Sequence, residues 1–136
     1  MVGKVSVTGK STMGKVVRIL VVDDELPICE LMDEFLSSQG YQIMTATNGE
    51  EALAKFEDTG PDVVILDLRM PGMSGLEVLR SMRAQGGAAH IIMLSAYGDS
   101  PTVQEALRSG ANYYVEKPMK FSQLVEILKD IENEAE

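Results

Sequence analysis

The sequence predicts a doubly wound α/β domain built on a five-stranded parallel sheet. Short apolar, β-branched segments alternate with segments of helical periodicity, and there are five of each. Most of the short segments are apolar throughout, as parallel strands covered on both faces must be. Strict alternation implies right-handed crossovers with helices on both faces of the sheet. The chain of 136 residues has the length of one compact domain.

Each expected strand is a short run rich in β-branched or aromatic residues. In chain order the five runs are VVRILVV, YQIMTA, DVVILD, HIIMLS and NYYVE, at residues 16–22, 41–46, 62–67, 90–95 and 112–116.

The first expected helix has the clearest amphipathic pattern, and Gly40 follows it as a C-cap glycine. Its apolar residues recur at i, i+3, i+4, i+7 and i+8, namely Ile28, Leu31, Met32, Phe35 and Leu36. The second expected helix has Asn48 as its N-cap and stops at Gly60 and Pro61. It carries the stripe Ala52, Leu53 and Phe56.

The remaining helices follow the same pattern. The third carries Leu76, Leu79 and Met82. The fourth begins at Ser100 and Pro101, closes at Gly110 and carries Val103, Ala106 and Leu107. The fifth carries Phe121, Leu124, Val125, Leu128 and Ile131. Met32, Met82 and Met93 fall on core-facing positions and are expected to fill gaps in the core.

Composition excludes several classes of function. The formal net charge of −9 and the absence of a basic cluster argue against direct binding to nucleic acid or to anionic membranes. The only cysteine, Cys29, cannot form an internal disulfide and is expected to be a plain buried thiol. The first apolar run is interrupted by Arg18 and ended by Asp23, so it resembles neither a signal peptide nor a membrane span. A cytoplasmic protein is expected.

Residues 1–14 lack helical periodicity and are rich in Gly, Ser, Thr and Lys. They are expected to form a flexible N-terminal arm or to be a remnant of expression, since Met13 could be a natural start. The GKST within them is not a phosphate-binding loop, because Lys4 stands where that motif requires glycine. The folded domain is expected to span residues 15–136.

Chemically reactive side chains end four of the five expected strands. The first ends in Asp23 and Asp24, the third in Asp67, the fourth in Ser95 and the fifth in Lys117. Because ligands bind outside the carboxyl ends of the strands in such sheets, these residues form a candidate site. Each also has an ordinary structural interpretation, such as capping a helix or a turn. Four strand ends with chemically complementary residues, three acids with one cation and one hydroxyl, favour a functional site.

Three carboxylates in a small volume repel one another by about 4 kcal/mol per contact near 4 Å at an effective dielectric constant of 20. Protonation, Lys117 or a hard divalent cation could offset this charge. We expect Mg²⁺ together with Lys117. The thiolate and imidazole ligands typical of zinc are represented only by Cys29 and His90, which lie elsewhere in the pattern.

The segments LVVDDE, VILDLRMPGMSG, LSA and EKP, in this order, resemble the receiver domain of bacterial two-component response regulators. The resemblance covers about residues 16–132. It implies a flavodoxin-like (βα)5 fold with strand order 2-1-3-4-5, an order that periodicity does not supply. The implied function is phosphoryl transfer from a histidine kinase or phosphotransfer protein, catalysed by the domain on itself, rather than conventional enzyme catalysis.

The resemblance also implies roles for single residues. Asp67 would be the phosphoryl acceptor, and Asp24 and Asp67 would bind Mg²⁺ directly. Asp23 would act mostly through water, and the backbone carbonyl of Arg69 would be a further ligand. Ser95 would bond one phosphoryl oxygen.

Lys117 would hold another phosphoryl oxygen and precede a cis proline, Pro118. Ser95 and Tyr114 would form a switch that remodels the face of the fourth helix, fifth strand and fifth helix, which could also support a homodimer.

Arg69 and Tyr97 would flank the route of the hydrolytic water and lengthen the phosphoryl lifetime. An apolar rim, consisting of Leu26, Pro27 and Met119, would dock the kinase, and a downstream protein or domain would receive the output.

Three alternative functions fit the sequence less well. A phosphatase of the haloacid dehalogenase type requires a second acid where Arg69 stands. A flavodoxin-like binding module requires a phosphate loop rich in Gly, Ser and Thr after the first strand, but that loop reads DDELP. A degenerate receiver used only as a scaffold would not need the intact acids, lysine and hydroxyl.

Overall fold

The computed structural model describes residues 16, 18–96 and 100–134. They divide into two compact units, of which the larger runs from Val17 to Met119. The smaller contains Val16 and the segment from Lys120 onward. The expected arm, residues 1–14, and Tyr97 lie outside the described residues.

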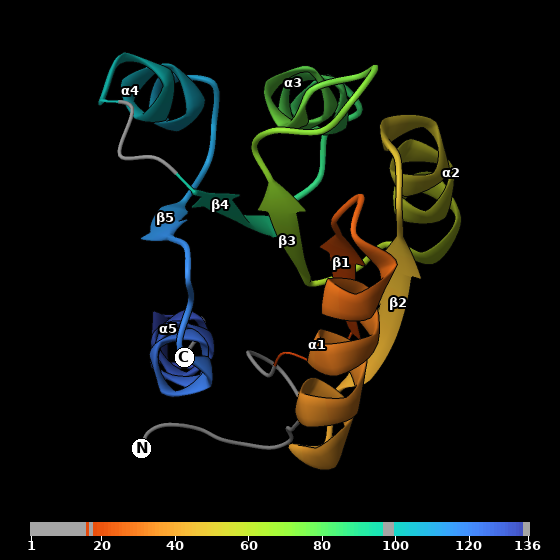
Figure 1. The fold of residues 1–136 in the computed structure, drawn as a ribbon, viewed down its shortest axis with the longest axis vertical. Coiled ribbons are helices and arrows are strands. Elements are labelled where there is room, and N and C mark those ends of the chain that lie inside the picture. Colours follow the sequence, from red (N-terminus) through yellow and green to blue (C-terminus); the bar gives the residue numbers. More distant parts are fainter. Residues whose placement is uncertain (1–15, 17, 97–99, 135–136) are drawn as a thin grey trace. The chain divides into compact units, whose positions relative to one another are not determined.

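A five-stranded parallel sheet forms the centre of the larger unit. Its strands are β1 (Arg18–Val22), β2 (Gln42–Ala46), β3 (Val63–Asp67), β4 (His90–Ser95) and β5 (Tyr113–Glu116). They lie in the order β2-β1-β3-β4-β5, and each neighbouring pair is parallel (Figure 1). The predicted fold class and strand order are confirmed.

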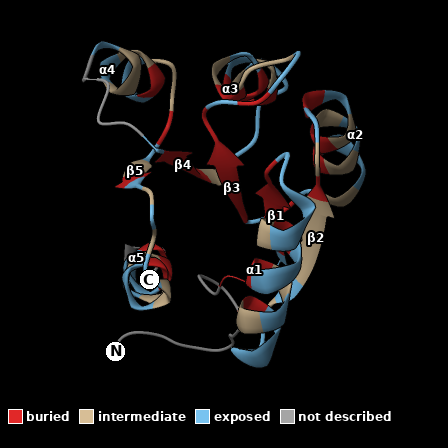
Figure 2. Ribbon diagram, viewed as in Figure 1, coloured by how far each residue is buried: buried red, intermediate tan, exposed pale blue. Residues whose placement is uncertain are grey.

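Burial of the strands follows their place in the sheet. Every residue of β3 is buried, and β1 and β4 are buried apart from their first residues. The edge strands β2 and β5 are largely of intermediate burial (Figure 2). The apolar strand sequences are therefore explained by cover on both faces only for the three central strands.

Four helices belong to the larger unit: α1 (Leu26–Ser38), α2 (Gly49–Thr59), α3 (Gly75–Ala84) and α4 (Ser100–Arg108). Helix α1 covers one face of the sheet, whereas α2, α3 and α4 lie over the other (Figure 1). On that second face, buried apolar residues of the strands and of the three helices form one continuous core. This core includes Met82 and Met93, as expected from the sequence.

The predicted helix ends are largely confirmed. Asn48 caps α2 by accepting a hydrogen bond from the amide of Glu51 at 2.8 Å, and Gly60 ends it with a positive φ of 59°. Gly40, with φ of 99°, follows α1. Helix α3 begins with a capping box between Ser74 and Glu77.

Two leucines assigned to apolar stripes are exposed. Leu31 is 50% exposed and Leu107 is 43% exposed, so their assignment to the core was wrong. The buried residues of α1 are Cys29, Met32 and Leu36. At 100° per residue Leu31 lies about 130° from the centre of that stripe, which places it toward solvent.

The smaller unit contains α5 (Phe121–Glu134), the expected fifth helix. Its first turn closes when the amides of Gln123 and Leu124 donate to the carbonyl of Lys120. The amide of Val16 donates to Oε2 of Glu132 at 3.1 Å. Across the described part of the chain, no helix combines the length and the apolar character needed to cross a membrane.

Candidate functional site

Asp67 is the last residue of β3, and only 5% of it is exposed. The backbone on either side is tightly held. The amide of Leu68 donates to the carbonyl of Leu94 at 2.8 Å, and the amide of Gly75 donates to the carbonyl of Leu68 at 3.0 Å. A Cβ atom added to Gly75 would lie 2.2 Å from the carbonyl oxygen of Asp67. Glycine is therefore required for this close approach behind Asp67.

Asp23 follows the last residue of β1 and is 1% exposed. Its amide donates to the carbonyl of Ala46 at 3.1 Å, which continues the pairing of β1 with β2. Its Oδ1 accepts a hydrogen bond from the amide of Glu25 at 2.9 Å. Asp24 is exposed. The two neighbouring acids therefore differ in environment, one buried and one open to solvent.

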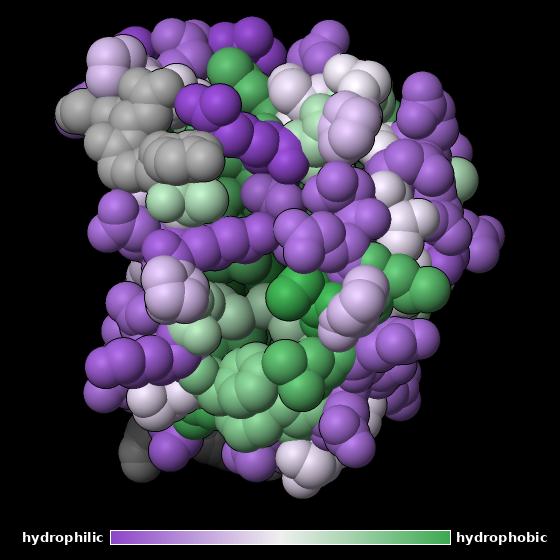
Figure 3. Space-filling view, viewed as in Figure 1, coloured by the Kyte–Doolittle hydropathy of each residue, from purple (hydrophilic) through white to green (hydrophobic). Residues whose placement is uncertain are grey.

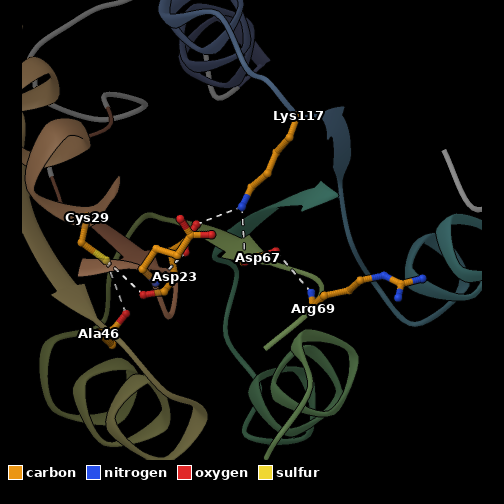
Figure 4. A network of polar contacts seen from close by, with 7 residues as sticks. Asp23, Cys29, Ala46, Asp67, Arg69 and Lys117 are labelled. Carbon is orange, nitrogen blue, oxygen red and sulfur yellow. Dashed lines mark hydrogen bonds and ion pairs between the residues drawn. The ribbon is translucent and has the colours of Figure 1, made fainter. Parts of the chain in front are cut away.

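Lys117, just after β5, joins the two buried acids. Its Nζ lies 3.1 Å from Oδ2 of Asp23 and 3.3 Å from Oδ2 of Asp67 (Figure 4). Its amide donates to the carbonyl of Ser95 at 2.7 Å, and the peptide bond to Pro118 is cis. The structure thus brings three of the expected site residues into direct contact.

Burial governs the ionisation of this group. Burial, the largest effect, together with repulsion by Asp23, raises the pKa of Asp67 by more than Lys117 and the hydrogen bond from the Arg69 amide lower it. Burial of the Lys117 ammonium opposes its charge, but attraction to Asp67 and Asp23 is stronger and raises the pKa of Lys117. The charged lysine therefore compensates for a carboxylate whose own ionisation is disfavoured.

Carboxylate oxygens suited to a hard cation gather beside this pair. One oxygen each from Asp23, Asp24 and Glu25 lie within 4.8 Å of one another. These are the ligands that Mg²⁺ prefers, so the donor set fits that ion. No role was predicted for Glu25, although it stands next to the two aspartates in the acidic run.

Ser95 and Arg69 complete the expected acceptor surroundings. Ser95 is fully buried at the end of β4, where it pairs with Glu116 of β5. The amide of Arg69 donates to Oδ1 of Asp67 at 3.2 Å, while its side chain extends away from the acids (Figure 4). A cavity of about 580 Å³ lies beside this loop, lined in part by Arg69 and Thr102.

Tyr114 lies in β5 opposite Met93 and is of intermediate burial. Its hydroxyl oxygen is buried and has no hydrogen-bond partner. Such an oxygen costs about 1–3 kcal/mol relative to a satisfied one. A rearrangement that gives this hydroxyl a hydrogen-bond partner would therefore be favourable.

Cys29 lies beneath Asp23 on α1 and is fully buried. Its Sγ is 3.3 Å from the carbonyl oxygen of Asp23 and 3.8 Å from that of Ala46 (Figure 4). Burial, followed by the nearby charge of Asp23, raises the pKa of the thiol. The expected plain buried thiol is confirmed.

Comparison with known proteins agrees with this geometry. Residues 19–129 match the response regulator receiver domain. Over 107 residues, 79% of this chain, the sequence is 41% identical to the regulatory protein AtoC of Escherichia coli, and it spans 23% of that protein. It is 35% identical over 112 residues to sporulation initiation phosphotransferase F of Bacillus subtilis, covering 82% of this chain and 90% of that protein.

A solved structure is also similar. The response regulator TrrA of Thermotoga maritima, in complex with Mg²⁺ and BeF, shares 47% identity with a TM-score of 0.76, over 85% of this chain and 98% of that one. The parallel sheet in the order 2-1-3-4-5, the acids at its carboxyl edge and the family match lead to one conclusion: this chain belongs to the receiver domain family of response regulators.

Proposed function

We propose that this domain accepts a phosphoryl group on Asp67, in a Mg²⁺-dependent transfer from the phosphohistidine of a histidine kinase or phosphotransfer protein. The observation that carries the proposal is the Lys117 ammonium, which lies within 3.3 Å of both Asp23 and Asp67. A buried carboxylate needs such a cation before it can receive a further anion.

In the proposed transfer, one carboxylate oxygen of Asp67 attacks phosphorus in line with the histidine nitrogen. The new oxygen–phosphorus bond forms as the phosphorus–nitrogen bond breaks, and the imidazole nitrogen keeps the electron pair. The product is an aspartyl acyl phosphate. The domain thereby acts only on itself, which distinguishes it from a conventional enzyme.

The surrounding residues would stabilise the transferred group. Lys117 would bind one phosphoryl oxygen, and the hydroxyl of Ser95 another. Asp23, Asp24 and Asp67, with the backbone carbonyl of Arg69, would hold Mg²⁺, which supplies positive charge against the phosphoryl oxygens. Structural support comes from the carboxylate oxygens of Asp23 and Asp24, which lie within 4.8 Å of each other, and from Lys117, which contacts both Asp23 and Asp67.

Intact mass after exposure to acetyl phosphate and Mg²⁺ tests the proposal. The wild type should gain one phosphoryl group, and Asp67→Asn should gain none. An equal gain of mass in the variant would show that a residue other than Asp67 accepts the phosphoryl group. No gain in either protein would favour the scaffold alternative.

We propose the apolar rim of Leu26, Pro27 and Met119 as the docking surface for the phosphohistidine donor. Leu26 is 54% exposed, and Leu31 adds a second exposed leucine on the same helix. Figure 3 shows apolar surface among hydrophilic side chains over α1. Alanine at all three rim positions should slow labelling by the kinase but not by acetyl phosphate. Unchanged labelling by the kinase would exclude this surface.

We further propose that Ser95 and Tyr114 transmit phosphorylation to α4 and β5. Movement of the Ser95 hydroxyl toward the phosphoryl group would free space for the Tyr114 ring, whose hydroxyl lacks a partner in this structure. A downstream protein or domain would read the altered surface. A structure with Mg²⁺ and beryllium fluoride should show both side chains displaced; unmoved side chains would refute the coupling.

A further inference from the structure

Glu25 occupies the N-cap position of α1 without acting as a side-chain cap. Its backbone is extended, with φ of −95° and ψ of 104°, and its carboxylate accepts no capping hydrogen bond. Its amide is engaged instead, donating to Oδ1 of Asp23. The exposed carboxylate therefore remains available, and one of its oxygens lies within 4.8 Å of the oxygens of Asp23 and Asp24.

Only some of the acidic residues of the site are paired with a cation. Lys117 contacts Asp23 and Asp67, the two buried acids. Among the described residues, no lysine or arginine forms an ion pair with Asp24 or Glu25. Within the described part of the chain, the solvent-facing side of the site therefore carries two carboxylates without a cationic partner.

We propose that Glu25 is a specificity-determining residue of the acceptor site, which attracts the divalent cation and disfavours small anionic phosphoryl donors. This inference rests on the proposed function. A carboxylate about 5 Å from a bound unit charge in water changes the binding constant of that charged ligand by roughly fourfold. The binding constant of a doubly charged ion or donor changes more strongly. The effect has opposite signs for Mg²⁺ and for a phosphate dianion.

A protein donor is less sensitive to this single charge. Its binding free energy is distributed over an extended contact, which would include the exposed leucines of α1. A small donor such as acetyl phosphate has only its charge and a few polar contacts to hold it. Glu25 would therefore favour a docked phosphohistidine over freely diffusing acyl phosphates.

The test compares Glu25→Gln with Glu30→Gln. Glu30 is an exposed acid on the same helix, its loss changes net charge equally, and it lies outside the group of three oxygens. Titration calorimetry with Mg²⁺ alone should show affinity weakened roughly four- to tenfold in Glu25→Gln. At saturating Mg²⁺ and low salt, acetyl phosphate should label this variant several-fold faster than wild type, and the difference should narrow at high salt.

Glu30→Gln should behave as wild type in both measurements, and Glu25→Asp should retain most of the Mg²⁺ affinity. Wild-type Mg²⁺ affinity in Glu25→Gln, or equal changes in the two glutamine variants, would overturn the inference. Failure of wild type to be labelled, or labelling of Asp67→Asn, would instead refute the proposed function. The Mg²⁺ titration would still test Glu25 in that case.

Discussion

The ammonium of Lys117 lies 3.3 Å from Oδ2 of Asp67, although 50 residues separate the two in sequence. Their strands, β5 and β3, are not neighbours, because β4 lies between them. They meet because all the strands are parallel and end at one edge of the sheet. The contact places a cation against a carboxylate that is only 5% exposed.

Replacing Lys117 with methionine should weaken both folding and phosphoryl transfer. The buried carboxylates of Asp23 and Asp67 would face one another without the ammonium, which should lower the free energy of unfolding by about 2 kcal/mol at neutral pH. Labelling of Asp67 by acetyl phosphate should fall at least tenfold. Urea unfolding and intact mass measure the two effects.

Lys55→Met is the matched control for this change. Lys55 pairs with Glu51 on α2, where both side chains are about 40% exposed, and its ammonium also donates to the carbonyl of Thr45 at 2.6 Å, so its loss should cost roughly 1 kcal/mol or less. Its labelling should equal that of wild type. Equal stability losses in the two variants would show that the contacts of Lys117 have no special energetic weight.

Asp67→Asn should stabilise the metal-free protein at neutral pH. Because the folded-state pKa of Asp67 is raised, folding is disfavoured as pH rises from the ordinary aspartate pKa to the folded value, and the penalty is complete above it. Removing the charge should raise Tm by roughly 4 °C, corresponding to about 1 kcal/mol. The gain should vanish below the ordinary aspartate pKa, as thermal unfolding from pH 3.5 to 7 would show.

The raised pKa of Lys117 affects stability in a separate, alkaline pH range. Its stabilising contribution is complete below the ordinary lysine pKa and is lost only as pH rises through the raised folded value. The Asp67→Asn effect between pH 3.5 and 7 is therefore not confounded by lysine. A destabilised Asp67→Asn at pH 7 would mean that the Lys117 contact outweighs burial.

The sequence predicted the edge at which Asp23, Asp67 and Lys117 meet, because strand ends in a parallel sheet share one side. It did not predict the order of the strands, which periodicity leaves open and only the family resemblance supplied. Leu31 was misassigned because the buried sector of α1 is centred on Cys29, Met32 and Leu36, and an apolar residue at helical spacing can lie well outside it. Sequence spacing alone does not define where that sector ends.

Glu25 was overlooked for a different reason. Helix capping was considered for its neighbour Asp24, since aspartate is a preferred N-cap and glutamate is not, and no role was predicted for Glu25. The structure shows that its side chain caps nothing and lies with Asp23 and Asp24. The signal in the sequence was the run of three acids after a buried strand.

Arg69 and Tyr97 are predicted to lengthen the lifetime of the phosphoryl group. The double variant Arg69→Asn, Tyr97→Ala should dephosphorylate several-fold faster, because a long cation and a bulky ring would no longer restrict the hydrolytic water. Arg69 is exposed and its amide lies 3.2 Å from Asp67 Oδ1. Loss of the phosphoryl mass increment with time measures the rate, and an unchanged rate would exclude the idea.

Gly75→Ala should destabilise the domain more than Gly49→Ala does, although both glycines begin helices. A Cβ at position 75 would lie 2.2 Å from the Asp67 carbonyl oxygen and 2.7 Å from Leu68 Cα, both backbone atoms. At position 49 the three nearest atoms are Sδ, Cβ and Cγ of Met73, at 2.6–2.9 Å; Sδ and Cγ can rotate away, whereas the contact with Cβ is relieved only by a small shift of the loop that carries Met73. Urea unfolding should show losses of about 3 kcal/mol or more for Gly75→Ala and roughly 1 kcal/mol for Gly49→Ala. Labelling at 10 °C should be impaired only in Gly75→Ala, since its acceptor loop must shift; similar behaviour of the two variants would contradict this account.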